Sequence, residues 1–125
     1  MLGAHPIYVV LLSRDLGETR SFYHDKLGLP IIRESDDAIS FRSGATSLDV
    51  TKSTTGTADT QTQAAWMVED LQAEVAELRS RGVEVQDYDM PGLKTEDGIA
   101  DVGFAHAAWI VDPHGNALGI LQLKS

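Results

Sequence analysis

The sequence predicts an α+β fold in which two βαβββ modules make up one domain of 125 residues. Three observations lead to this prediction. Short segments rich in β-branched and apolar residues recur along the chain, as is typical of strands. A helical pattern that opens with Asp and closes with Gly occurs twice, at residues 15–28 and 70–82. A polar linker, at about 53–62, separates the modules, which span about 1–52 and 63–125.

The first module opens with an apolar segment, residues 5–16, that predicts a buried strand. A helix follows, with Asp15 at its N-cap and Gly28 at its end. Three further strands are predicted in residues 29–34, 38–43 and 45–52.

The second module repeats this order after a strand that precedes Asp70. The helix that Asp70 caps closes at Gly82, and Glu77 and Arg81 have the i,i+4 spacing of an ion pair. A strand, a long loop and a hairpin are predicted next, in residues 83–88, in residues 89–103 and around His114. A loop of this length is either a lid over a pocket or an irregular surface crossover.

The register of the final hairpin follows from its turn. If His114 is the mirror point, paired residues have numbers that sum to 228, so Trp109 lies opposite Gly119. A glycine inside a strand often marks a close approach, which suggests that something needs room beside Trp109. The same rule pairs His106 with Gln122 on the other face of the hairpin.

Composition excludes several classes of function. A net charge of −9 argues against binding to nucleic acid or to an anionic membrane surface. The absence of cysteine excludes disulfides, thiolate metal sites and a cysteine nucleophile. The apolar run at residues 7–12 is too short to cross a bilayer and lacks the flanks of a signal peptide, so a cytoplasmic location is expected.

Three stretches together resemble the vicinal oxygen chelate superfamily, which includes glyoxalases, bleomycin resistance proteins, fosfomycin-modifying transferases and extradiol dioxygenases. They are RDLGETRSFYHDKLGLPI, VEDLQAEVAELRSRGVEV and DPHGNALGILQ, at residues 14–31, 68–85 and 112–122. The resemblance covers essentially the whole chain. It implies that the sheets curl into a cup with the helices outside, and that the chain forms a homodimer.

Enzymes of this superfamily hold a divalent metal with two ligands from each module. The resemblance places these four positions at Tyr8, Asp49, Gln63 and Gly119. Glycine offers no donor, and a phenol is a poor ligand because it keeps its proton at neutral pH. Two remaining oxygen ligands are too few for a tight site, so we expect neither a metal nor another cofactor.

We therefore expect the cup to bind a small apolar or aromatic molecule, with Trp109 as a stacking platform. Strand alternation turns Trp66 toward the helix layer instead. The four histidines lack metal-ligand spacing and are expected to be surface or structural residues. The predicted ligand-binding residues are Tyr8, Val10, Leu12, Asp49, Gln63, Met67, Trp109, Gly119 and Leu121.

Three functions remain open from the sequence. The first is a metal-independent binding protein of the sequestering type. The second is an enzyme, a lyase, isomerase or dioxygenase, that uses Asp49 and Tyr8 as an acid–base pair or recruits a metal through Asp49 and Gln63. The third is a structural module whose own side chains fill the cup. The first two functions require a small-molecule site, and the third requires none. None of the three involves a nucleic-acid or membrane partner.

Overall fold

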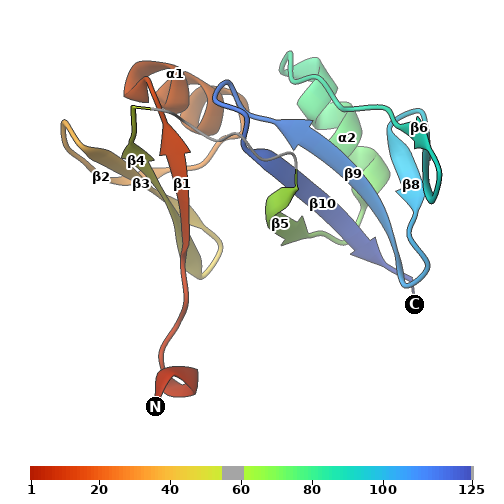
Figure 1. Cartoon of the computed structure of the whole chain (residues 1–125), viewed down its shortest axis with the longest axis horizontal. Coiled ribbons are helices and arrows are strands. Elements are labelled where there is room, and N and C mark those ends of the chain that lie inside the picture. Colours follow the sequence, from red (N-terminus) through yellow and green to blue (C-terminus); the bar gives the residue numbers. More distant parts are fainter. Residues whose placement is uncertain (55–60, 125) are drawn as a thin grey trace. The chain divides into compact units, whose positions relative to one another are not determined.

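The computed structural model describes residues 1–54 and 61–124, which form two compact units (Figure 1). Unit 1 contains the described residues 1–54 together with 113–116, and unit 2 contains residues 61–112 and 117–124. The centre of the predicted linker, residues 55–60, lies outside the described residues. No helix in the described part of the chain is long and apolar enough to cross a membrane.

Each unit has a mixed sheet and few helices, which confirms the predicted α+β class (Figure 1). Unit 1 contains η1 (Leu2–Ala4), β1 (Val9–Ser13), α1 (Leu16–Arg20), η2 (Ser21–Lys26), β2 (Ile31–Glu34), β3 (Ala38–Ser43) and β4 (Thr46–Lys52). Unit 2 contains β5 (Thr62–Met67), α2 (Leu71–Ser80), β6 (Asp89–Met90), β7 (Leu93–Glu96), β8 (Ile99–Asp101), β9 (Ala105–Val111) and β10 (Ala117–Leu123).

The sheet of unit 1 has the order β1-β4-β3-β2, with β1 parallel to β4 and the other pairs antiparallel. The predicted helix begins where expected, because the Asp15 carboxylate accepts hydrogen bonds from the amides of Gly17 (2.9 Å) and Glu18 (3.2 Å). The helix continues as the π-helical η2, and Gly28 follows with a φ of 77°.

Aromatic side chains from η2 and β3 form the core of unit 1. The ring of Tyr23, which is fully buried, lies 5.0 Å from the ring of Phe22 and 5.4 Å from that of Phe41. Ile39 and Val50 are buried as well. This core covers one face of the sheet.

The first predicted strand is buried on one face only. Strand β1 starts only at Val9, and Leu11 and Ser13 are buried, whereas Val10 and Leu12 are exposed. Successive side chains of a strand point to opposite faces, so only one face of β1 contributes to the core of unit 1.

The sheet of unit 2 has the order β5-β10-β9-β8-β7-β6, with β5 parallel to β10. The amide of Ala73 donates a hydrogen bond of 3.1 Å to the Asp70 carboxylate at the N-cap of α2, as predicted. Leu71 and Val75 are buried under the helix. The predicted ion pair also forms, with 2.8 Å between Arg81 Nε and Glu77 Oε1.

The hairpin of β9 and β10 has the predicted register. Trp109 pairs with Gly119, and His106 pairs with Gln122. Gln122 Oε1 accepts a 2.8 Å hydrogen bond from the amide of Leu71, which begins α2, so the Gln122 side of the sheet is the side that α2 covers. Trp109 lies on the opposite face, because it is three residues from His106 along the strand.

Two predictions for residues 83–103 are wrong. Residues 83–88 form no strand, although the amide of Gln86 donates a 2.8 Å hydrogen bond to the carbonyl oxygen of Trp109. The predicted loop 89–103 contains β6, β7 and β8, which extend the sheet as an antiparallel meander. The turn between β7 and β8 consists of Asp97 and Gly98, both with positive φ, which is the geometry of a two-residue hairpin.

Candidate functional site

The face of the unit 2 sheet opposite α2 is mainly apolar, and we call it the Trp109 face. Three of its larger side chains are well exposed, with exposed fractions of 62% for Met67, 52% for Leu123 and 39% for Val111. Its small residues lie between the larger ones along the strands. The pairing of β5, β10 and β9 puts on this face Ala65, Met67, Ala107, Trp109, Val111, Gly119, Leu121 and Leu123.

The indole of Trp109 is held in place from two sides. Its Nε1 donates a hydrogen bond of 3.2 Å to the hydroxyl of Thr62 on β5. The ring of Tyr88 meets it edge-on, with 5.6 Å between centroids and an interplanar angle of 84°. Because β10 lies between β9 and β5, the indole must cross β10 to reach Thr62, and it does so beside Gly119.

Gly119 therefore makes room for a side chain of the protein itself. A Cβ atom at this position would lie 3.3 Å from Thr62 Cγ2, 3.4 Å from Leu121 Cδ1 and 3.5 Å from Ala65 Cβ. The sequence suggested an empty space beside Trp109. In the structure the neighbouring side chains close around the glycine, and the indole extends across its strand.

Gln63 has a local structural role in unit 2. Its side-chain oxygen accepts a hydrogen bond of 3.0 Å from the amide of Ala117. The register between β5 and β10 shifts between Ala117 and Leu118, so this bond satisfies a backbone donor at an irregular point of the ladder. The oxygen that a metal would need is engaged by the backbone.

The predicted residues of unit 1 share one sheet face. The parallel register places Val10 beside Asp49, and Ser40 lies on the other side of Asp49. Val10 and Leu12 are exposed on this face, and Tyr8, which precedes β1, is 56% exposed. The structure thus brings Val10, Leu12 and Asp49 together within unit 1.

The residues at the four family metal positions do not fit a metal ion. Gly119 has no donor atom, the oxygen of Gln63 is bonded to a backbone amide, and Tyr8 carries a phenol. Within the residues that the structure describes, no three His, Asp or Glu side chains gather into a possible metal site. A single carboxylate, Asp49, is left as an ordinary ligand at these positions.

His24, His106 and His114 have different surroundings. His24 Nδ1 is 2.9 Å from the carboxylate of its neighbour Asp25 at the surface. His106 is exposed on the α2 side of the sheet. His114, expected at the tip of a turn, is only 5% exposed and makes contacts within unit 1.

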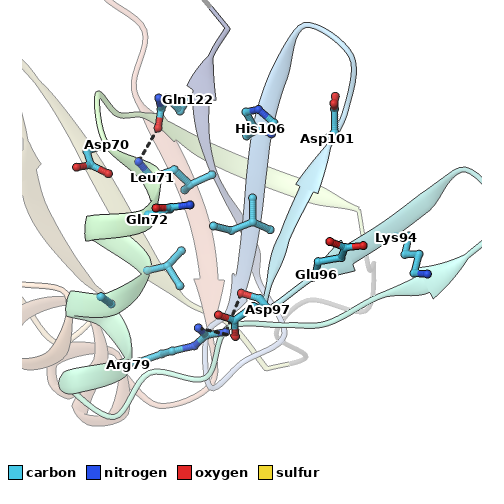
Figure 2. A pocket seen from close by; sticks show the side chains of 13 residues that line it. Asp70, Leu71, Gln72, Arg79, Lys94, Glu96, Asp97, Asp101, His106 and Gln122 are labelled. Atoms are coloured by element: carbon cyan, nitrogen blue, oxygen red, sulfur yellow. Dashed lines mark hydrogen bonds and ion pairs between the residues drawn. The ribbon is translucent and has the colours of Figure 1, made fainter.

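Unit 2 also has an open pocket of about 1000 Å³ between α2 and the strands β7 and β8 (Figure 2). Figure 2 shows Gln72 and Arg79 of α2 on one side, and Glu96 and His106 on the other. The sequence does not predict this pocket, because the segment that forms β7 and β8 is predicted as a loop. The Asp97-Gly98 dipeptide between two polar-apolar alternating segments was the signal that could have revealed them.

Three of the charged residues that line this pocket, Arg79, Asp97 and Asp101, form ion pairs. Arg79 donates hydrogen bonds of 3.1 Å to both the carboxylate and the carbonyl oxygen of Asp97. Lys124 Nζ lies 2.7 Å from Asp101, and this hydrogen bond, with one from the amide of Gly103, lowers the pKa of Asp101 below its usual value.

Comparisons with known proteins agree with the fold. The sequence model of the Glyoxalase/Bleomycin resistance protein/Dioxygenase superfamily matches residues 5–120. No functionally curated protein sequence matches the chain.

Solved structures of similar fold include proteins of different kinds. A glyoxalase family protein from Enterococcus faecalis has a TM-score of 0.73 and 20% identity, over 97% of this chain and 99% of that one. TnmS3, an antibiotic binding protein from Streptomyces sp. CB03234, has a TM-score of 0.69 and 20% identity, over 96% of each chain. A lactoylglutathione lyase from Agrobacterium tumefaciens has a TM-score of 0.66 and 20% identity, over 95% and 93%.

The family match spans nearly the whole chain, including the helix starts at Asp15 and Asp70 and most of the final hairpin. The chain belongs to the Glyoxalase/Bleomycin resistance protein/Dioxygenase superfamily.

Proposed function

We propose that this protein binds a small apolar or aromatic molecule on the Trp109 face of unit 2, without a metal, and that it sequesters this molecule. The observation that carries the proposal is the indole of Trp109, fixed between Thr62 and Tyr88 and bordered by apolar side chains. A flat ring held in one orientation loses little freedom when a ligand stacks on it. Such a ring is a ready platform for a planar molecule.

The neighbours of the indole support an apolar ligand. Met67 and Leu121 lie side by side on the same face, and methionine adapts its shape to irregular apolar partners. Thr62 is the polar side chain that contacts the indole, and its hydroxyl already accepts the Trp109 N–H. Similarity to an antibiotic binding protein, TnmS3, is consistent with this type of function.

Binding of the neutral fluorescent probe N-phenyl-1-naphthylamine tests the proposal. We expect the probe to gain fluorescence with the native protein, and Trp109→Ala to weaken its affinity by about tenfold, the equivalent of one lost stacking contact of about 1.4 kcal/mol. Chelator should leave binding unchanged. Fluorescence titration gives the dissociation constants.

The matched control is Trp66→Ala, because Trp66 pairs with Ile120 on the opposite face of the sheet. It should change probe affinity by less than about twofold where the variant remains folded, as checked by circular dichroism. Equal affinities of native protein and Trp109→Ala would contradict the proposal. So would loss of binding in the presence of chelator.

A second candidate, an acid–base enzyme, is favoured by one observation in unit 1. Asp49 is half-buried beside Val10, and among the described residues no hydrogen bond or ion pair reaches its carboxylate. A partly buried carboxylate without a partner is a common feature of catalytic sites. Tyr8, two residues before Val10, would be the proton-transfer partner.

The enzyme candidate predicts turnover that depends on Asp49. Lactoylglutathione, named for the similar lyase, is a suitable first test compound. If the candidate is correct, Asp49→Asn should reduce turnover by about 10²-fold or more while leaving affinity within about twofold. Absence of turnover by the native protein, with probe binding intact, would favour the binding protein over this enzyme.

A further inference from the structure

The turn between β9 and β10, residues 113–116, belongs to unit 1, although both strands it joins belong to unit 2. Two of its side chains are buried: His114 is 5% exposed and Asn116 is fully buried. Such burial is unusual for a polar turn, which normally lies on the surface.

Both side chains bond to the backbone of unit 1 at the end of β1. The Asn116 amide donates a hydrogen bond of 2.8 Å to the carbonyl oxygen of Leu12. The amide of Arg14 donates a bond of 3.3 Å to His114 Nδ1. The carbonyl of one residue and the amide two residues later point the same way along a strand, so the turn covers one stretch of strand edge.

Strand β1 needs such a cover because it is the outer strand of its sheet, paired with β4 alone among the described strands. Unpaired backbone groups at a sheet edge are open to water or to another chain. The side chains of His114 and Asn116 replace the missing neighbour at Leu12 and Arg14.

We propose that this turn is a pH-sensitive clasp on the edge of β1, which is closed while His114 Nδ1 carries no proton and opens at Arg14 when Nδ1 takes one. A ring nitrogen can accept the Arg14 N–H only if it is itself unprotonated. The ring proton of the neutral form must then be on Nε2, which faces the Glu18 carboxylate at 3.2 Å.

A second proton changes the two sides of the ring differently. On the Nδ1 side it places an N–H against the backbone N–H of Arg14, which cannot turn away, so this contact must open. On the Nε2 side the added charge attracts Glu18, but the Glu18 side chain is 57% exposed and water screens the attraction. The ring therefore stays near Glu18 while the bond to Arg14 is lost.

Other charged groups lie near these contacts in the sequence. The Asp15 carboxylate accepts bonds from the amides at the start of α1. Asp112, two residues before His114, is buried and has a partner of its own. The side chain of Arg14 is cationic and would oppose a charged imidazole. Glu18 is the charged group whose carboxylate lies 3.2 Å from His114 Nε2.

Amide hydrogen exchange measured by NMR tests the clasp on the whole native chain. When the pH is lowered from about 7.5 to about 5, the protection factor of the Arg14 amide should fall by about tenfold or more. The amide of Val50, in the core of unit 1, should keep its protection. Nitrogen chemical shifts of His114 should show the Nε2–H form at neutral pH.

Three variants separate the proton on His114 from the rest of the protein. His114→Asn offers an amide oxygen near the position of Nδ1 and does not titrate, so Arg14 should stay protected at both pH values. His114→Ala should leave Arg14 unprotected at both. His24→Asn is the matched control, because His24 is exposed and contacts Asp25, and it should behave as the native chain does.

Several results would overturn the clasp. One is a protection factor of the Arg14 amide that does not change across the pH range, or that falls equally in His114→Asn. Another is an equal fall in the protection factor of the Val50 amide. The last is an Nδ1–H form of His114 at neutral pH. Since the readouts concern Arg14 and His114 of unit 1, they do not depend on whether the Trp109 face binds a probe.

Discussion

Gly119→Val is expected to lower the free energy of unfolding by about 1–3 kcal/mol and to reduce binding of N-phenyl-1-naphthylamine by about tenfold or more. A Cβ at this position already meets Thr62 at 3.3 Å and Leu121 at 3.4 Å. The two further methyl groups of valine have no space in a strand with neighbours on both sides. They would also push the indole of Trp109 off β10 and break its bond to Thr62.

Two other glycine variants calibrate this result. Gly119→Ala adds only the Cβ, and neighbours that give by a few tenths of an ångström should keep the loss below about 1 kcal/mol. Gly3→Val is the matched control, because a Cβ at Gly3 meets nothing within 4 Å, and it should change stability by less than about 0.5 kcal/mol. Urea unfolding followed by circular dichroism measures all three. If Gly119→Val were as stable as Gly3→Val and bound the probe normally, the indole would not depend on the glycine.

Local patterns predicted the parts of the fold in which a residue's role depends on its near neighbours. The two helix starts at Asp15 and Asp70 follow from short side chains that bond to amides two or three residues away. The register of Trp109 and Gly119 follows from a two-stranded hairpin with one turn. Such features need no knowledge of distant parts of the chain.

Features that depend on distant residues were not predictable in the same way. Gln63 bonds to the backbone of Ala117, 54 positions later, because the ladder between their strands is irregular. His114 bonds to Arg14, 100 positions earlier, and therefore is buried where a turn residue would ordinarily be exposed. Family resemblance located Gln63 correctly on the first strand of unit 2, but it could not reveal that the backbone already uses its oxygen.

The failure to predict β7 and β8 from the sequence has a different cause. Asp97 and Gly98 form a two-residue turn with positive φ, a local signal that was present in the sequence. The signal is weak because β7 and β8 are only four and three residues long, too short for alternation to stand out. Their presence puts part of the sheet where the sequence left open a lid or a surface crossover, and it creates the pocket beside α2.

Phe41→Ala is expected to have the largest effect on stability, a loss of about 3–5 kcal/mol in the free energy of unfolding. Phe41 is fully buried, and its ring lies 5.4 Å from that of Tyr23, which in turn contacts Phe22. Removing the ring leaves a cavity that the surrounding strand and helix cannot close. Since a domain of this size commonly has only about 5–15 kcal/mol of stability, the variant should be close to unfolding at room temperature.

Phe104→Ala is the matched control, because it removes the same side chain from a position that is 64% exposed. It should change the free energy of unfolding by less than about 0.5 kcal/mol. Urea unfolding of both variants gives the comparison, and amide exchange in β3 and β4 shows whether the loss in Phe41→Ala begins in unit 1. Both tryptophans, Trp66 and Trp109, belong to unit 2, so their fluorescence reports separately on that unit. A Phe41→Ala variant within about 1 kcal/mol of the native chain would mean that the aromatic cluster of η2 and β3 is not what holds unit 1 together.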